Sequence, residues 1–172
     1  YFAESGIDSR KPLVKIIADC LMPNHYHLLI EEIAKGGITK FMHKLGTGYT
    51  MYFNKKNNRV GSLFQGPFKA VHVYDQNYLE YLLVYINVIN PGQLIEPSLK
   101  EEGVKNKEKV LNFARSYLWS THKEYLGQRD SMIIDKSLLG ETFPNGKSYE
   151  KFVEAVLPEK EKFDSMAHLF LE

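Results

Sequence analysis

The sequence is poor in cysteine, because Cys20 is the only one among 172 residues. A chain with one cysteine has no intramolecular disulfide, no thiolate zinc cluster and no Cys-x-x-Cys redox pair. Any metal ion must therefore be held by nitrogen and oxygen atoms.

Long apolar runs are also missing. No run of eighteen apolar residues occurs, and the first residues lack a basic segment followed by a hydrophobic block and a cleavage site. We therefore expect a soluble, cytoplasmic protein without a membrane partner.

Acidic residues are absent from residues 35–74, which contain seven lysines and arginines although the net charge of the whole chain is only +1. Aromatic residues lie between these basic residues, a combination suited to phosphates and to stacked bases. A solvated helix face above core aromatics would give the same pattern. The basic residues are Lys35, Lys40, Lys44, Lys55, Lys56, Arg59 and Lys69.

The order of apolar and turn residues predicts an α+β protein. "KPLVKIIADC" and "HYHLLIEE" flank the turn-like "MPN" and predict a β-hairpin. Apolar residues spaced by three and four predict a helix from Gly37 to about Lys56. Residues 61–75 look extended, with Pro67 marking an edge or a bulge. A second helix is predicted from about Gln76 to Ile89, capped by Asp75.

The last third of the chain changes character. Residues 96–112 are highly charged, and short helical patterns follow at 113–126 and 149–157. We expect a helical extension that packs against the sheet domain or touches substrate.

Two histidines stand one residue apart in the second predicted strand. Side chains alternate along a strand, so His25 and His27 point to the same side, roughly 6 to 7 Å apart along the strand. Two neutral imidazoles can bind one ion and leave positions for a third side chain, water or substrate. The alternative is one buried core histidine and one at the sheet edge.

Tyrosines recur on one face of the second predicted helix, at Tyr78, Tyr81 and Tyr85. Most such stripes form part of a core. A phenol has an ordinary pKa of about 10, so it becomes a nucleophile only when its oxyanion is stabilised and the electrophile is activated. A divalent ion beside a phosphodiester supplies the second condition and part of the first.

Three segments in this order carry a family resemblance: "CLMPNHYHLLIE", "FMHKLGTGYTMYFNKKNNRVGSLFQGPFKAV" and "YLEYLLVYINVINP". Over about residues 13–92 the chain resembles the IS200-like tyrosine transposases, particularly their REP-associated branch, within the HUH (His-hydrophobic-His) endonuclease superfamily. "YLWSTHKEYLG" is similar to the Trp-Ser-Ser segment of that branch.

The resemblance implies roles for individual residues. His25 and His27 match the metal-binding pair, for Mg²⁺ or Mn²⁺, and Tyr85 matches the nucleophile. In "GSLFQGPFK", Gln65 and Lys69 match positions expected to contact DNA, beside the basic residues Lys44, Lys55, Lys56 and Arg59.

The resemblance also implies a fold. It is a ferredoxin-like or RRM-like antiparallel sheet with helices on one face, plus a C-terminal helical extension. We expect residues 1–95 to form the catalytic domain and residues 96–172 the extension. The family usually has a strand and a helix ahead of the hairpin, where this chain has only "YFAESGIDSR", so we expect these two elements to be missing.

The second departure concerns the third metal ligand. The family usually reads Tyr-Ile-x-x-Asn-Pro, whereas "YINVINP" contains one extra residue and puts Asn90 five residues after Tyr85. A local π-bulge would bring Asn90 into the ligand position; otherwise Asn87 or water completes the site.

The predicted activity is metal-dependent nicking and strand transfer of single-stranded DNA through a 5′-phosphotyrosine, with a hairpin-bearing strand as partner and a homodimer as a possible assembly. One alternative is a noncatalytic nucleic-acid binding module with a decayed metal site. Another is a metal-dependent hydrolase that uses water, in which Tyr85 only packs.

Overall fold

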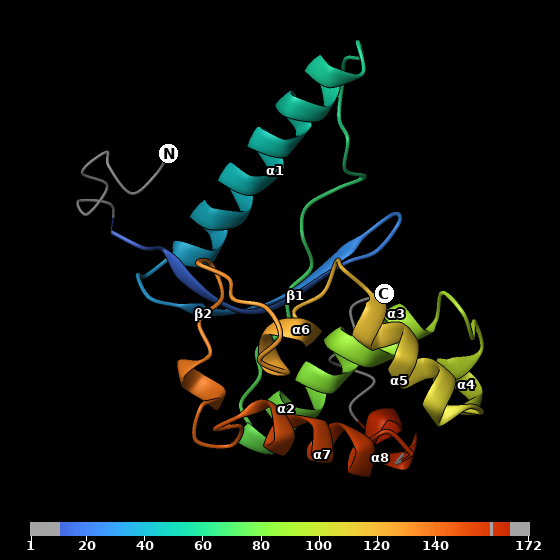
Figure 1. Ribbon diagram of the computed structural model, residues 1–172. Helices are drawn as coiled ribbons and strands as arrows, with labels where there is room; N and C mark the ends of the chain where they lie inside the picture. Colours follow the sequence, from blue (N-terminus) through green and yellow to red (C-terminus); the bar gives the residue numbers. More distant parts are fainter. Residues whose placement is uncertain (1–10, 159, 166–172) are drawn as a thin grey trace. The chain divides into compact units, whose positions relative to one another are not determined.

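The computed structural model describes residues 11–158 and 160–165 (Figure 1). The chain divides into two compact units, one made of residues 1–15 and 30–69 and the other of residues 16–29 and 70–172. The α+β class is confirmed. The described residues form one sheet of two strands, so the ferredoxin-like assignment and the boundary near residue 95 stay predictions.

The predicted hairpin is confirmed. Strand β1 covers Val14–Leu21 and strand β2 covers Tyr26–Glu32. The amide of Met22 donates a hydrogen bond to the carbonyl oxygen of His25 (2.9 Å), which closes the turn around Pro23. His25 therefore ends the turn and His27 lies on the strand.

In the first unit the predicted helix is also confirmed, as α1 from Gly37 to Lys56. The Glu32 carboxylate accepts hydrogen bonds from the amides of Gly36 and Ile38 (3.2 and 3.1 Å) and so satisfies donors that the first turn leaves open. A Cβ atom at Gly37 would lie 2.3 Å from the carbonyl oxygen of Leu13, so only glycine permits this close approach of helix and strand.

The segment predicted to be extended, residues 61–75, forms neither strand nor helix. Its side chains are largely exposed, and Pro67 has no amide hydrogen to give to a strand ladder. This part of the prediction is wrong, because the segment lacks the buried face that would fix a strand.

In the second unit a long buried helix forms the centre of the core. It starts as α2, Gln76–Val84, continues as the π-helix η2, Tyr85–Ile89, and ends as α3, Asn90–Gly92. The Asp75 carboxylate caps it by accepting from the amide of Asn77 (2.7 Å), as predicted. Every residue from Tyr81 to Gly92 is buried.

The remaining helices of the described chain surround this central helix (Figure 1). Buried residues of α5 (Val110, Leu111 and Ala114) and of α7 (Tyr149 and Val153) belong to the same core as β1. The helices are α4 Leu99–Glu102, α5 Lys107–Ser116, α6 His122–Tyr125, the short 3₁₀ helix η3 Ser137–Leu139, α7 Gly146–Val156 and α8 Lys160–Ser165.

The C-terminal region also covers the outer edge of β1. The amide of Leu21 donates to the carbonyl oxygen of Trp119 (2.7 Å), that of Thr121 to Asp19 (3.1 Å) and that of Asp135 to Ile16 (2.8 Å). These bonds satisfy backbone groups that an open sheet edge would expose. Within the described part of the chain, no helix is long and apolar enough to cross a membrane.

Candidate active site

The two predicted metal-binding histidines lie side by side in the second unit. Their ring centroids are 5.0 Å apart and the rings are nearly perpendicular. His25 is exposed and His27 is half-buried. Nδ1 of His25 donates a hydrogen bond to Oδ1 of Asn24 (2.7 Å), which leaves its Nε2 atom with the lone pair.

The predicted nucleophile lies next to this pair. The ring of Tyr85 is 6.0 Å from the ring of His27, again nearly perpendicular to it. Tyr85 is 1% exposed. Tyr81, one turn earlier, faces the core instead, where it packs against Phe152 and Phe163.

Burial sets the electrostatics of these groups. It lowers the pKa of His27 to about 4, helped by the charges of His25 and Lys100, and it lowers the pKa of His25 in the same direction. Both imidazoles are therefore neutral at pH 7, the form that binds metal. Burial also raises the pKa of Tyr85 above its ordinary value, so the phenol stays protonated without an activating group.

The extra residue after Tyr85 is accommodated by a π-helix, one of the two structures that the sequence left open. The amide of Asn90 donates to the carbonyl oxygen of Tyr85, five residues earlier. Asn90 thus follows Tyr85 by one hydrogen-bonded turn, as residue i+4 does in an α-helix. Its side chain is fully buried; Oδ1 accepts from Gln93 (3.2 Å), and Nδ2 has no partner among the described residues.

Asn87, the alternative ligand, is occupied elsewhere. Its Nδ2 atom donates to the hydroxyl of Tyr149 (3.3 Å), and its Oδ1 atom accepts from Oγ1 of Thr121 (2.8 Å). The same Tyr149 hydroxyl lies 2.9 Å from Nδ1 of His122. Because both ends of its amide are bound inside this buried network, Asn87 is engaged in holding the C-terminal region against the central helix.

Sequence reasoning missed Lys100, which lies on α4. Its Nζ atom is 4.9 Å from the centroid of the Tyr85 ring. Burial lowers its pKa to about 8, against the opposite effect of Glu101. No motif marks this lysine, because it stands in a charged stretch without periodicity.

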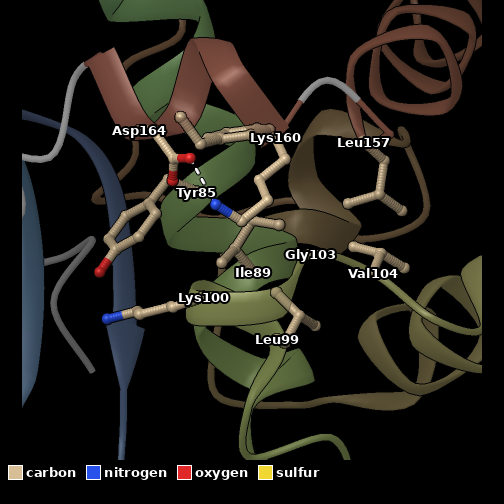
Figure 2. A pocket seen from close by; sticks show the side chains of 10 residues that line it. Tyr85, Ile89, Leu99, Lys100, Gly103, Val104, Leu157, Lys160 and Asp164 are labelled. Carbon is tan, nitrogen blue, oxygen red and sulfur yellow. Dashed lines mark hydrogen bonds and ion pairs between the residues drawn. The ribbon is translucent and has the colours of Figure 1, made fainter.

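A cavity of about 180 Å³ adjoins the Tyr85 ring. Ile89 and Leu99 form part of its apolar wall, and the ion pair of Lys160 with Asp164 lies on another side. Figure 2 shows the hydroxyl of Tyr85 and the amine of Lys100 pointing to the same side.

The predicted DNA-contacting residues all belong to the first unit and are all exposed. Lys56 lies over the ring of Tyr52, and Arg59 over that of Phe53, each at 5.7 Å. Tyr49 and Tyr52 are about half exposed, at 49% and 58%. Besides Lys56 and Arg59, these residues are Lys44, Lys55, Gln65 and Lys69.

Among the described residues, no group of three or more His, Cys, Asp or Glu side chains could hold a metal ion. The predicted site is of another kind, since its third ligand is an amide.

Comparison with known protein families gives a match. The family model described as "Transposase IS200 like" matches residues 9–88, a segment that contains His25, His27 and Tyr85. No curated protein and no solved structure matches the chain significantly.

Proposed function

We propose, from the match of residues 9–88 to the IS200-like transposase family, that this chain is a DNA-processing enzyme of that kind, which nicks and transfers single-stranded DNA with Tyr85 as nucleophile. The observation that carries the proposal is the approach of the His27 ring to the Tyr85 ring, at 6.0 Å. A nucleic-acid binder needs neither the histidine pair nor a phenol beside it.

The proposed reaction is a transesterification. The phenolic oxygen of Tyr85 forms a bond to the scissile phosphorus, and the bond from phosphorus to the 3′ oxygen breaks. The phenolic proton passes to solvent, and a proton from solvent completes the released 3′-hydroxyl. One phosphodiester replaces another, so the 5′-phosphotyrosine keeps the linkage for a later 3′-hydroxyl to attack, and no nucleotide cofactor is needed.

His25, His27 and Asn90 are the proposed ligands of a Mg²⁺ or Mn²⁺ ion. The donor set fits such an ion: both imidazoles are neutral, the rings are 5.0 Å apart, and Oδ1 of the buried Asn90 amide has a second lone pair besides the one that accepts from Gln93. When bound, the ion would polarise the scissile phosphate and offset its charge. Asn24 orients His25 by accepting from Nδ1, and burial keeps His27 neutral by lowering its pKa.

The first unit is proposed to hold the DNA strand. Its lysines and Arg59 would contact phosphates, and the half-exposed rings of Tyr49 and Tyr52 would stack on unpaired bases. We take the strand to carry a hairpin and the sheet to be the core of a ferredoxin-like fold, both by similarity to the family. Because Tyr85 and His27 meet within one chain, a homodimer would form through surfaces other than this site.

The test is covalent capture. Incubating the protein with a labelled, hairpin-bearing single strand and Mn²⁺ should give a protein–DNA adduct on a denaturing gel. Tyr85→Phe should abolish the adduct and leave DNA binding nearly intact, because only the attacking oxygen is removed. Tyr81→Phe is the matched control, since this neighbouring buried tyrosine packs on Phe152 and Phe163, and it should still form the adduct.

One observation favours a noncatalytic binding module instead: Tyr85 is 1% exposed and its pKa is raised. That function predicts DNA binding without any adduct in the wild-type protein. A hydrolase that uses water predicts cleavage without protein-linked DNA. An undiminished adduct in Tyr85→Phe would exclude Tyr85 as the nucleophile.

A further inference from the structure

Lys100 lies at the candidate nucleophile but outside the segment that matches the family. It belongs to α4, twelve residues beyond the end of that match at residue 88. Its neighbour Leu99 is 2% exposed, and a Cβ atom at Gly92 would lie 2.9 Å from Cδ1 of Leu99. Tight packing of Leu99 on the end of the central helix therefore fixes the backbone from which the lysine extends.

The Lys100 side chain reaches the reacting group rather than solvent. Its Nζ atom is buried and lies 4.9 Å from the centroid of the Tyr85 ring. Figure 2 shows this nitrogen and the Tyr85 hydroxyl on the same side of the helix. An ammonium at this place can touch an anion bound to the Tyr85 oxygen.

The electrostatic surroundings favour an anionic ligand. Among the described residues, Lys100 faces the Tyr85 ring and lies within electrostatic range of His25 and His27, whose pKa values its charge lowers; Glu101 is an acid on its own helix. On the cavity wall, Asp164 is already paired with Lys160. A phosphate within reach of this ammonium would form a charge-assisted contact with it, which is stronger than a contact between neutral groups.

We infer that Lys100 is a further catalytic residue, whose ammonium contacts a non-bridging oxygen of the scissile phosphate while Tyr85 attacks the phosphorus. This inference rests on the proposed function. Lys100 remains protonated throughout: it gives no proton to the 3′ oxygen and stabilises the added negative charge on the phosphate in the transition state.

Three variants test the charge. Lys100→Met keeps most of the hydrocarbon volume and removes the ammonium, so the single-turnover rate of adduct formation should fall by about a hundredfold, the scale of losing one such stabilising donor. Lys100→Arg keeps the charge and should restore most of the rate. Lys160→Met is the control, since this cavity-wall lysine is already paired with Asp164 and should form the adduct at the wild-type rate.

A second substrate separates catalysis from packing. A methylphosphonate at the scissile position removes the charge that Lys100 would stabilise, so Lys100→Met and wild type should react with it at similar rates. A wild-type rate for Lys100→Met on the ordinary phosphodiester would overturn the inference and leave the proposed function standing. So would equal losses of rate on both substrates, which indicate a structural role. If wild type and Lys100→Arg form no adduct at all, the proposed function itself fails.

Discussion

The amide of Asn90 donates a hydrogen bond to the carbonyl oxygen of Tyr85, across five residues instead of four. This bond defines the π-helix Tyr85–Ile89 within a helix that is otherwise α-helical. π-Helical turns are rare and occur frequently at functional sites. Here the turn compensates for one extra residue, so the asparagine keeps its place one turn after the tyrosine.

If that place is the third ligand position, Asn90→Ala should weaken Mn²⁺ binding. Loss of an outer-shell partner already costs metal sites about 10- to 100-fold in affinity, so loss of a ligand should cost at least as much. Asn90→Asp keeps an oxygen donor and should bind Mn²⁺ at least as well as the wild type. Isothermal titration of Mn²⁺ into the three proteins measures the difference.

Deleting Ile89 tests the role of the π-helix itself. The deletion gives "YINVNP", in which a regular α-helix puts the asparagine at the ligand position. Mn²⁺ affinity should stay closer to that of the wild type than to that of Asn90→Ala. Circular dichroism should show that both proteins are folded. Equal losses of Mn²⁺ affinity in the deletion and in Asn90→Ala would then contradict the proposal that the π-helix places Asn90 at the third ligand position.

Local patterns predicted much of this structure. The hairpin, helix α1 and the Asp75 cap depend on residues close in sequence, and counting residues after Tyr85 was enough to raise the π-helix as one possibility. Lys100 and the partners of Asn87 could not be predicted, because they depend on contacts between distant segments. Residues 61–75 have strand-forming residues but no buried face, and here local propensity misled the prediction.

The buried network around Asn87 should contribute to stability. Tyr149→Phe removes the hydroxyl that contacts Asn87 and His122, which leaves buried polar atoms without that partner. We expect the free energy of unfolding to fall by about 1–3 kcal/mol. Urea denaturation measures it, with Tyr74→Phe as control because Tyr74 is 88% exposed. Equal stability of the two variants would show that the network contributes nothing measurable.

His122 should make stability depend on pH. Burial lowers its pKa from an ordinary value of 6.5 to about 4, with a smaller effect of Arg115. Between these values the unfolded chain binds more protons than the folded one, so stability is full above pH 6.5 and is lost as the pH falls toward 4. Between pH 7 and pH 5 the protonation of this group should lower the free energy of unfolding of the wild type by about 2 kcal/mol.

His122→Asn keeps a polar atom near the Nδ1 position and cannot titrate. This variant should have a lower free energy of unfolding than the wild type at pH 7. The difference between the two free energies should be smaller at pH 5, because only the wild type loses stability through His122. Other groups with shifted pKa values, such as His27, are present in both proteins and cancel in the comparison. A difference that is the same at both pH values would show that His122 is not held neutral.

The basic end of α1 should bind DNA through phosphates. Lys55 and Lys56 are exposed in its last turn, so changing both to alanine should weaken binding of a single strand. For every phosphate that the variant no longer neutralises, the slope of log affinity against log salt should become shallower by about 0.7. Fluorescence anisotropy between 50 and 200 mM salt measures this slope. Over this range, larger protein–DNA interfaces lose affinity by about 10³–10⁵-fold.

The matched control changes two other exposed lysines, Lys109 on α5 and Lys151 on α7, to alanine. Both double variants remove two positive charges, so a general effect of net charge would weaken binding equally. Preferential weakening in the Lys55 and Lys56 variant places the strand on α1. Equal weakening in the two variants would instead mean that the aromatic and basic surface of α1 is a solvated helix face, the other interpretation that its sequence allows.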